Sequence, residues 1–135
     1  MSELTLEAKV ENLDDVIAFV DSALEEVGCP PRTQMQIDIS VEELFVNIAN
    51  YAYAPNVGLA TIKVQTRDDP KEIAITFIDS GVPYNPLAKA DPDITLSSEE
   101  RQIGGLGIFM AKKSMDKIEY EYTDGKNMLT IKKAI

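Results

Sequence analysis

Residues 37–51 read IDISVEELFVNIANY, and this stretch decides which fold we expect. Its apolar residues recur every three or four positions, which is the spacing of one buried helix face. The residues of this stripe are Ile37, Val41, Leu44, Ile48 and Tyr51. Thr33 and Gln36 fit a capping box at the start of such a helix, and residues 55–58 carry the signals that end it. The stretch therefore predicts one long helix packed against a core.

The segments on either side predict a mixture of strands and helices. Residues 3–10 alternate as a strand does, and Asn12 is placed to cap a following helix that Gly28 ends. The other expected elements are strands at about 59–66 and 72–78, a helix at about 105–115, and strands at about 117–123 and 128–133 joined by a hairpin turn at 123–126.

Residues 79–104 show no regular periodicity and contain three prolines. A compact domain rarely keeps so long an irregular loop without a function, so we expect residues 84–103 to form a mobile lid. The order is strand, two helices, two strands, lid, helix and hairpin. It predicts an α+β fold, a two-layer α/β sandwich with the helices on one face of a mixed, mostly antiparallel sheet.

The composition limits the possible functions. A length of 135 residues fits a single domain, 1–135. A net charge of -10 argues against nucleic-acid binding and against adsorption to anionic membranes. The chain has no histidine, which excludes His-based nucleophilic catalysis, His-ligated zinc and self-phosphorylation on histidine. The N-terminus lacks the apolar stretch of a signal peptide, so we expect a cytoplasmic protein, and we assign no role to the lone Cys29.

Three groups of residues could carry chemistry. Glu43, Asn47 and Asn50 share one face of the long helix, either as an ordinary solvated face or as polar groups that point into a cleft. Asp79-Ser80-Gly81 follows an apolar strand and is either a turn or an acceptor for a ligand such as an adenine amino group. Gly104-Gly105-Leu106-Gly107-Ile108 opens a helix, where the glycines serve either as a hinge or to let backbone amides approach a phosphate.

Together these segments resemble the ATP-binding boxes of the gyrase, Hsp90, histidine kinase and MutL superfamily, over essentially the whole chain. Within it the chain is similar to the anti-sigma factor serine kinases, which implies a Bergerat-type ATP-binding fold. The resemblance implies that Glu43 is the general base, that Asn47 is the Mg²⁺ ligand, and that Asp79 with Gly81 binds adenine. Tyr51 departs from the pattern, because many relatives carry His there.

The resemblance also implies further contacts to the nucleotide. The glycine segment 104–108, with Asn50, would contribute to ATP binding, Arg101 would reach the terminal phosphate, and Thr130 would lie beside the adenine. We therefore expect an ATP- and Mg²⁺-dependent regulatory protein-serine kinase, a homodimer, that binds a sigma factor and phosphorylates an anti-anti-sigma antagonist. The alternatives are an ATP-gated binding module with little phosphotransfer and an unrelated α+β interaction domain.

Overall fold

Five strands and three helices build the fold, in a computed structural model that describes residues 2–88 and 105–135. The strands are β1 (Ser2–Glu7), β2 (Leu59–Asp68), β3 (Lys71–Asp79), β4 (Lys117–Thr123) and β5 (Lys126–Ala134). The helices are α1 (Leu13–Glu26), α2 (Pro31–Tyr51) and α3 (Gly105–Ser114), with short 3₁₀ turns η1 (Val10–Asn12) and η2 (Pro86–Ala88). None of these helices is long and apolar enough to span a bilayer.

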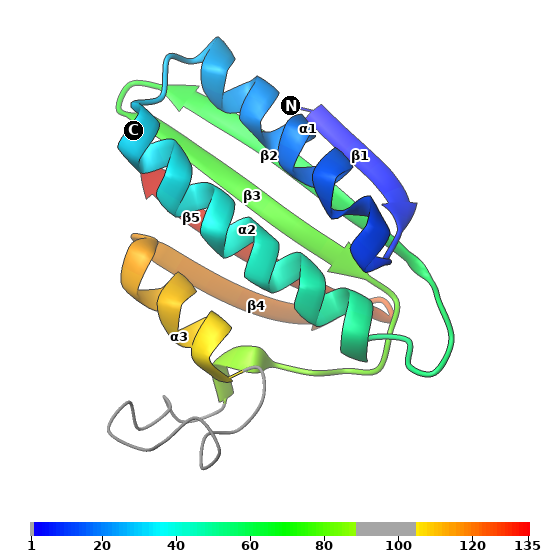
Figure 1. Cartoon of the computed structure of the whole chain (residues 1–135). Helices are drawn as coiled ribbons and strands as arrows, with labels where there is room; N and C mark the ends of the chain where they lie inside the picture. The colour runs from blue at the N-terminus through cyan, green and yellow to red at the C-terminus, as the bar shows by residue number, and fades with distance from the viewer. Residues whose placement is uncertain (1, 89–104) are drawn as a thin grey trace.

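The strands form one sheet in the order β1-β2-β3-β5-β4, and each neighbouring pair is antiparallel. All three helices cover the same face of this sheet, α1 near β2, α2 along the middle and α3 beside β4 (Figure 1). In the central strand β3, every second residue from Ile73 to Asp79 is buried, including Ile75 and Phe77. The alternate residues of β3 and the apolar face of α2 therefore pack against each other in a single core.

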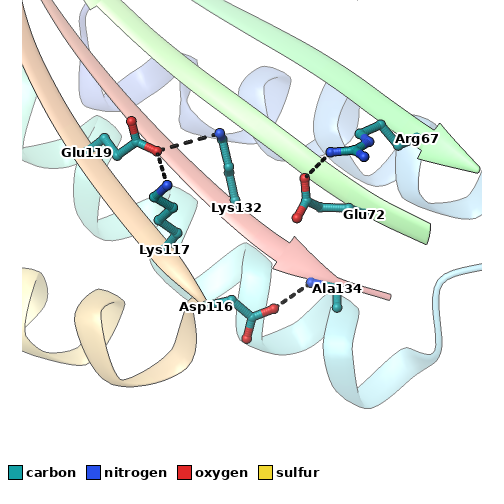
Figure 2. A network of polar contacts seen from close by, with 7 residues as sticks. All are labelled: Arg67, Glu72, Asp116, Lys117, Glu119, Lys132 and Ala134. Atoms are coloured by element: carbon teal, nitrogen blue, oxygen red, sulfur yellow. Dashed lines mark hydrogen bonds and ion pairs between the residues drawn. The ribbon is translucent and has the colours of Figure 1, made fainter. Parts of the chain in front are cut away.

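No helix of the described residues covers the opposite, helix-free face of the sheet, which carries polar pairs (Figure 2). There Glu119 lies 3.3 Å from Lys117 and 3.5 Å from Lys132, and the Arg67 guanidinium lies 3.7 Å from Glu72. Exposed pairs of this kind contribute little to stability. These pairs place charged side chains on the solvent-facing side of the sheet.

The α+β class and the single helical layer predicted from the sequence are confirmed, and three details differ. Every described strand pair is antiparallel, where we expected a mixed, mostly antiparallel sheet. Asn12 occupies the N-cap position of α1, as expected, but its side chain donates a hydrogen bond to the Glu7 carbonyl at 2.9 Å and makes no capping bond to the helix. The predicted capping box of Thr33 and Gln36 is wrong, because α2 already begins at Pro31, whose ring suits the first helical position.

Candidate functional site

A cavity of about 520 Å³ lies between the second half of α2 and the ends of β3 and β5. Its wall includes backbone and side chains from α2, from β3 and the segment that follows it, and from the β4–β5 hairpin. The lining residues are Leu44, Asn47, Ile48, Tyr51, Ala52, Phe77, Asp79, Val82, Tyr84, Pro86, Tyr120, Asn127 and Leu129. Most of this wall is apolar or aromatic, and the few polar groups are placed at defined points, as in small-molecule sites.

Asp79 is the acidic residue of this wall. It is the last residue of β3, its side chain faces the helices, and it is only 6% exposed. Its Oδ1 accepts hydrogen bonds from the Gly81 backbone N–H at 2.9 Å and from Asn127 Nδ2 at 2.9 Å. Both bonds end on the same oxygen, so Oδ2 is the oxygen left to accept a hydrogen bond from a ligand.

Asn127 connects Asp79 to the rest of the cavity wall. Its Nδ2 also donates to the Val82 carbonyl at 2.9 Å, while its Oδ1 accepts from the Tyr84 backbone N–H at 3.1 Å and from the Tyr120 hydroxyl. Asn127 is buried and pairs directly with Asp79 across β3 and β5. Its amide therefore fixes the carboxylate and the segment after β3 in one arrangement.

The close approach of two backbones explains Gly81. A Cβ atom on this residue would lie 2.2 Å from the Ala52 carbonyl oxygen, so any side chain would push the segment away from the end of α2. The Val82 N–H donates to the same carbonyl at 3.1 Å, and the Tyr53 hydroxyl accepts from the Ser80 N–H at 2.7 Å. The Asp79–Val82 segment is thus held against the C-terminal end of α2.

The polar face of α2 reaches the cavity only in part. Asn47 is half-buried and lines the cavity, and Tyr51 lines its rim. Glu43 and Asn50 are exposed and do not belong to the lining. Glu43 lies one helical turn before Asn47, on the same face of α2.

The remaining site predictions have separate outcomes. Arg101 and Gly104 lie outside the described residues. Gly105, Leu106 and Gly107 form the first turn of α3, as expected, and Ile108 is buried in the core.

Thr130 does not reach the cavity. Its hydroxyl is 3.0 Å from that of Thr76, on the helix-free face of the sheet. Asn127, three residues earlier on β5, lies on the opposite face and occupies the position beside Asp79. Sequence reasoning missed Asn127 as a site residue, although the hairpin turn at 123–126 marked where its strand begins.

Comparison with known proteins finds one matching family and several named relatives. The profile of the family described as "Histidine kinase-like ATPase domain" matches residues 6–133. The chain is 27% identical over 100 residues to the serine/threonine-protein kinase BtrW of Bordetella bronchiseptica, covering 74% of this chain and 70% of that protein. It is 29% identical over 112 residues to an anti-sigma F factor of Caldanaerobacter subterraneus, covering 83% of this chain and 72% of that protein.

Two further matches extend over nearly the full chain. The serine-protein kinase RsbW of Bacillus mycoides is 27% identical over 134 residues, covering 96% of this chain and 82% of that protein. A chain from the crystal structure of the SiaB-SiaC complex from Pseudomonas aeruginosa superposes with a TM-score of 0.60 at 16% identity, covering 98% of this chain and 89% of that chain. The structural match supports the fold, and the sequence matches agree with the resemblance to anti-sigma factor kinases.

Proposed function

The chain belongs to the family of histidine kinase-like ATPase domains, and from this we propose that its cavity binds ATP and that the bound ATP phosphorylates a serine on a partner protein. The single observation that carries the proposal is the buried carboxylate of Asp79, held by Asn127 and Gly81 at the inner wall of the cavity. A buried carboxylate without a cationic partner costs free energy unless it has donors to bind. A ligand with its own donor would supply the missing hydrogen bond.

Adenine fits this wall better than guanine does. Its exocyclic amino group is a donor that Oδ2 of Asp79 can accept, whereas guanine has a carbonyl oxygen at that position. The planar base would pack between apolar and aromatic side chains, with Leu44 and Ile48 from α2 and Phe77 and Leu129 from the sheet. Asn127 would act here as a positioning residue, because it orients the carboxylate that reads the base.

The donor set also fits a magnesium ion at the edge of the cavity. Asn47 offers an amide oxygen, and Mg²⁺ in phosphate sites needs few protein oxygens because it keeps several waters and binds phosphate directly. When bound, the ion would neutralise phosphate charge. Asn47 would hold it, and the N-terminus of α3 at Gly105 would present backbone N–H groups to anionic oxygens.

Glu43 would supply the base for transfer. Its carboxylate would accept the proton of the serine hydroxyl as the serine oxygen bonds to the γ-phosphorus. The bond from that phosphorus to the β-phosphate oxygen breaks, and ADP leaves with the electron pair. The exposure of Glu43 suits this role, because a protein substrate must approach it from solvent.

The relatives suggest what the partners are. By analogy with the anti-sigma F factor and the RsbW kinase, we infer a regulator that binds a sigma factor and phosphorylates an antagonist of the anti-anti-sigma type. We also infer a cytoplasmic homodimer. A second candidate, an ATP-gated binding module with little transfer, is favoured by the position of Glu43 outside the cavity lining.

One pair of variants separates the two candidates. Glu43→Gln keeps the shape and removes the base, so ATP affinity should stay within a few-fold while transfer falls about 10²–10⁴-fold. Asn47→Asp should disturb both affinity and transfer, because Asn47 would hold the metal. Glu26→Gln, an exposed carboxylate on α1, is the matched control and should change neither. Equal loss of ATP binding in Glu43→Gln and Asn47→Asp, measured by calorimetry, would eliminate the kinase mechanism.

A further inference from the structure

A second hollow, of about 740 Å³, lies between α1 and the first half of α2 and shares no lining residue with the cavity described above. We call it the α1–α2 groove. Its lining residues are Leu13, Asp14, Ile17, Glu25, Gly28, Cys29, Pro31, Gln34, Met35, Asp38, Ile39 and Glu42. Nothing in the proposed ATP chemistry uses these residues.

The apolar part of the groove is unusually open to water. Met35 and Ile39 are 64% and 44% exposed, and they lie one helical turn apart on the same side of α2. Leu13 and Ile17 are spaced in the same way on α1 and are half-buried. Two apolar stripes, one from each helix, thus line a hollow that the chain itself does not fill, which is typical of a protein interaction surface.

The charged part of the groove has one sign. Asp14 and Glu25 from α1 and Asp38 and Glu42 from α2 belong to the lining, and the lining that the structure describes contains no lysine or arginine. An occupant would therefore meet carboxylates on both helices. Such an environment disfavours nucleic acid, anionic membrane and acidic proteins, and it favours a basic partner.

Asp38 lies beside a second acidic residue, Asp21, which adds to the negative character of the groove. Asp38 Oδ1 and Asp21 Oδ1 are buried, and neither has a hydrogen-bond donor among the described residues. Burial, the neighbouring Asp21 carboxyl and the charge of Glu25 raise the pKa of Asp38 to about 7. Burial and the charge of Asp38 also raise the pKa of the Cys29 thiol at the same end of the groove. Burial is the largest cause of both shifts, and neighbouring negative charge adds to each.

A second copy of the chain would not bring positive charge into the groove. In a two-fold contact, both protomers present the same surface patch. This patch would bring acidic lining against acidic lining, with no basic lining residue to offset the repulsion. An amphipathic helix with basic residues fits the groove better. Its apolar stripe can lie along the apolar rows of α1 and α2, while lysine or arginine beside the stripe pairs with the carboxylates of the groove.

We propose that the α1–α2 groove is the docking site for an amphipathic helix of a partner protein, with lysine or arginine flanking its apolar stripe. The apolar stripe contacts Met35, Ile39 and Ile17, and a basic side chain donates to Asp38. This proposal does not depend on nucleotide binding, so it can fail or succeed independently of the kinase proposal.

The test uses the full chain and a displayed library of 18-residue helices. Each helix keeps leucine at the stripe positions, while the flanking positions vary among Lys, Glu and Ser. We expect selected helices to be enriched several-fold in Lys at the flanks and to bind more weakly as salt increases. Met35→Ser/Ile39→Ser and Asp38→Asn should each weaken binding about 10-fold or more, a loss typical of central interface contacts.

Matched controls are available outside the groove. Val57→Ser removes an equally exposed apolar side chain from the loop before β2, and Glu26→Gln removes an exposed carboxylate from α1; both should bind the selected helices as the parent does. Selected helices without basic enrichment, or binding that survives the Met35/Ile39 double variant, would overturn the proposal. So would self-association of the chain that the groove variants abolish, because the occupant would then be a second copy.

Discussion

Replacing Asn127 with leucine should damage both the fold and the cavity. Leucine has the same number and branching of side-chain heavy atoms as asparagine but no polar atoms, so the substitution removes the amide without emptying the site. Four hydrogen bonds end on that amide, from or to Asp79, Val82, Tyr84 and Tyr120. Asn127 itself is only 7% exposed, so these groups are largely shielded from bulk water.

The size of the effect follows from these contacts. A buried polar group that loses its partner costs about 1–3 kcal/mol. Asp79 Oδ1 keeps the bond from the Gly81 N–H, and the adjacent cavity can admit water, so the losses should not add in full. We expect Asn127→Leu to lower the free energy of unfolding by about 2–4 kcal/mol, a large share of the 5–15 kcal/mol typical of a domain.

Urea denaturation with ATP and GTP titrations measures both consequences. Besides the loss of stability, ATP affinity should fall about 10–100-fold, because Asp79 loses the group that orients it. Thr130→Val is the matched control on the same strand. It removes one hydrogen bond, to Thr76 on the helix-free face, and should cost less than about 1 kcal/mol with no change in ATP affinity.

Two results would contradict this reasoning. If Asn127→Leu were no less stable than Thr130→Val, the buried network around Asn127 would not exist in solution. If Asn127→Leu bound ATP normally while Asp79→Asn did not, Asn127 would not orient the carboxylate. An outcome in which Thr130→Val alone lost ATP binding would restore the expectation drawn from the sequence.

The other predictions concern base selectivity, packing and pH. Asp79→Asn should weaken ATP binding at least about 10-fold and reduce the preference for ATP over GTP, because the new amide can place its N–H donor opposite the amino donor of adenine. Competition calorimetry measures this preference. If GTP bound the parent chain as tightly as ATP does, Asp79 would not read the base. Gly81→Ala should lower the free energy of unfolding by about 2 kcal/mol or more in denaturant melts, since the new Cβ would lie 2.2 Å from the Ala52 carbonyl oxygen. An unchanged stability would show that the Asp79–Val82 segment is not held against α2. The pKa of Asp38 is about 7 in the folded chain against the usual 3.8. Between these two values the folded chain holds a proton that the unfolded chain has released. The free energy of unfolding should therefore decline as pH rises from about 4 to 7. Asp38→Asn should therefore raise the free energy of unfolding at pH 8 by about 1 kcal/mol, a modest value because the groove is open to solvent. This gain in stability should shrink toward pH 5. A gain that does not change with pH would contradict the assignment to Asp38.

The elements could be predicted because each has a strong local pattern. The alternation in β3 and the apolar stripe of α2 specify burial directly, and Asp124-Gly125 adopts the positive φ angles that its hairpin turn needs. Helix starts were less predictable. Pro31 and Thr33 both suit a helix N-terminus, and the choice between them depends on where the preceding chain leaves α1.

The error at Thr130 has a different cause. Successive residues of a strand point to opposite faces, so assigning a residue to the cavity requires the register of β5 against β3. That register places Asn127 opposite Asp79 and Thr130 opposite Thr76. The sequence contains the two polar residues but not their pairing. Likewise, the separation of Asn47 from Glu43 and Asn50 depends on which part of α2 borders the cavity, which no pattern within α2 encodes.

Helix α2 has one consequence for regulation. Its 21 residues form a wall of the cavity through Asn47 and Ile48 and a wall of the α1–α2 groove through Asp38 and Ile39. Two ligands bound at these places would touch the same rigid rod about two turns apart. If a ligand bound at one place changes the affinity at the other by some factor, the second ligand changes the affinity at the first by the same factor, because linkage between two binding equilibria is reciprocal. A partner on the groove would then sense nucleotide without touching it.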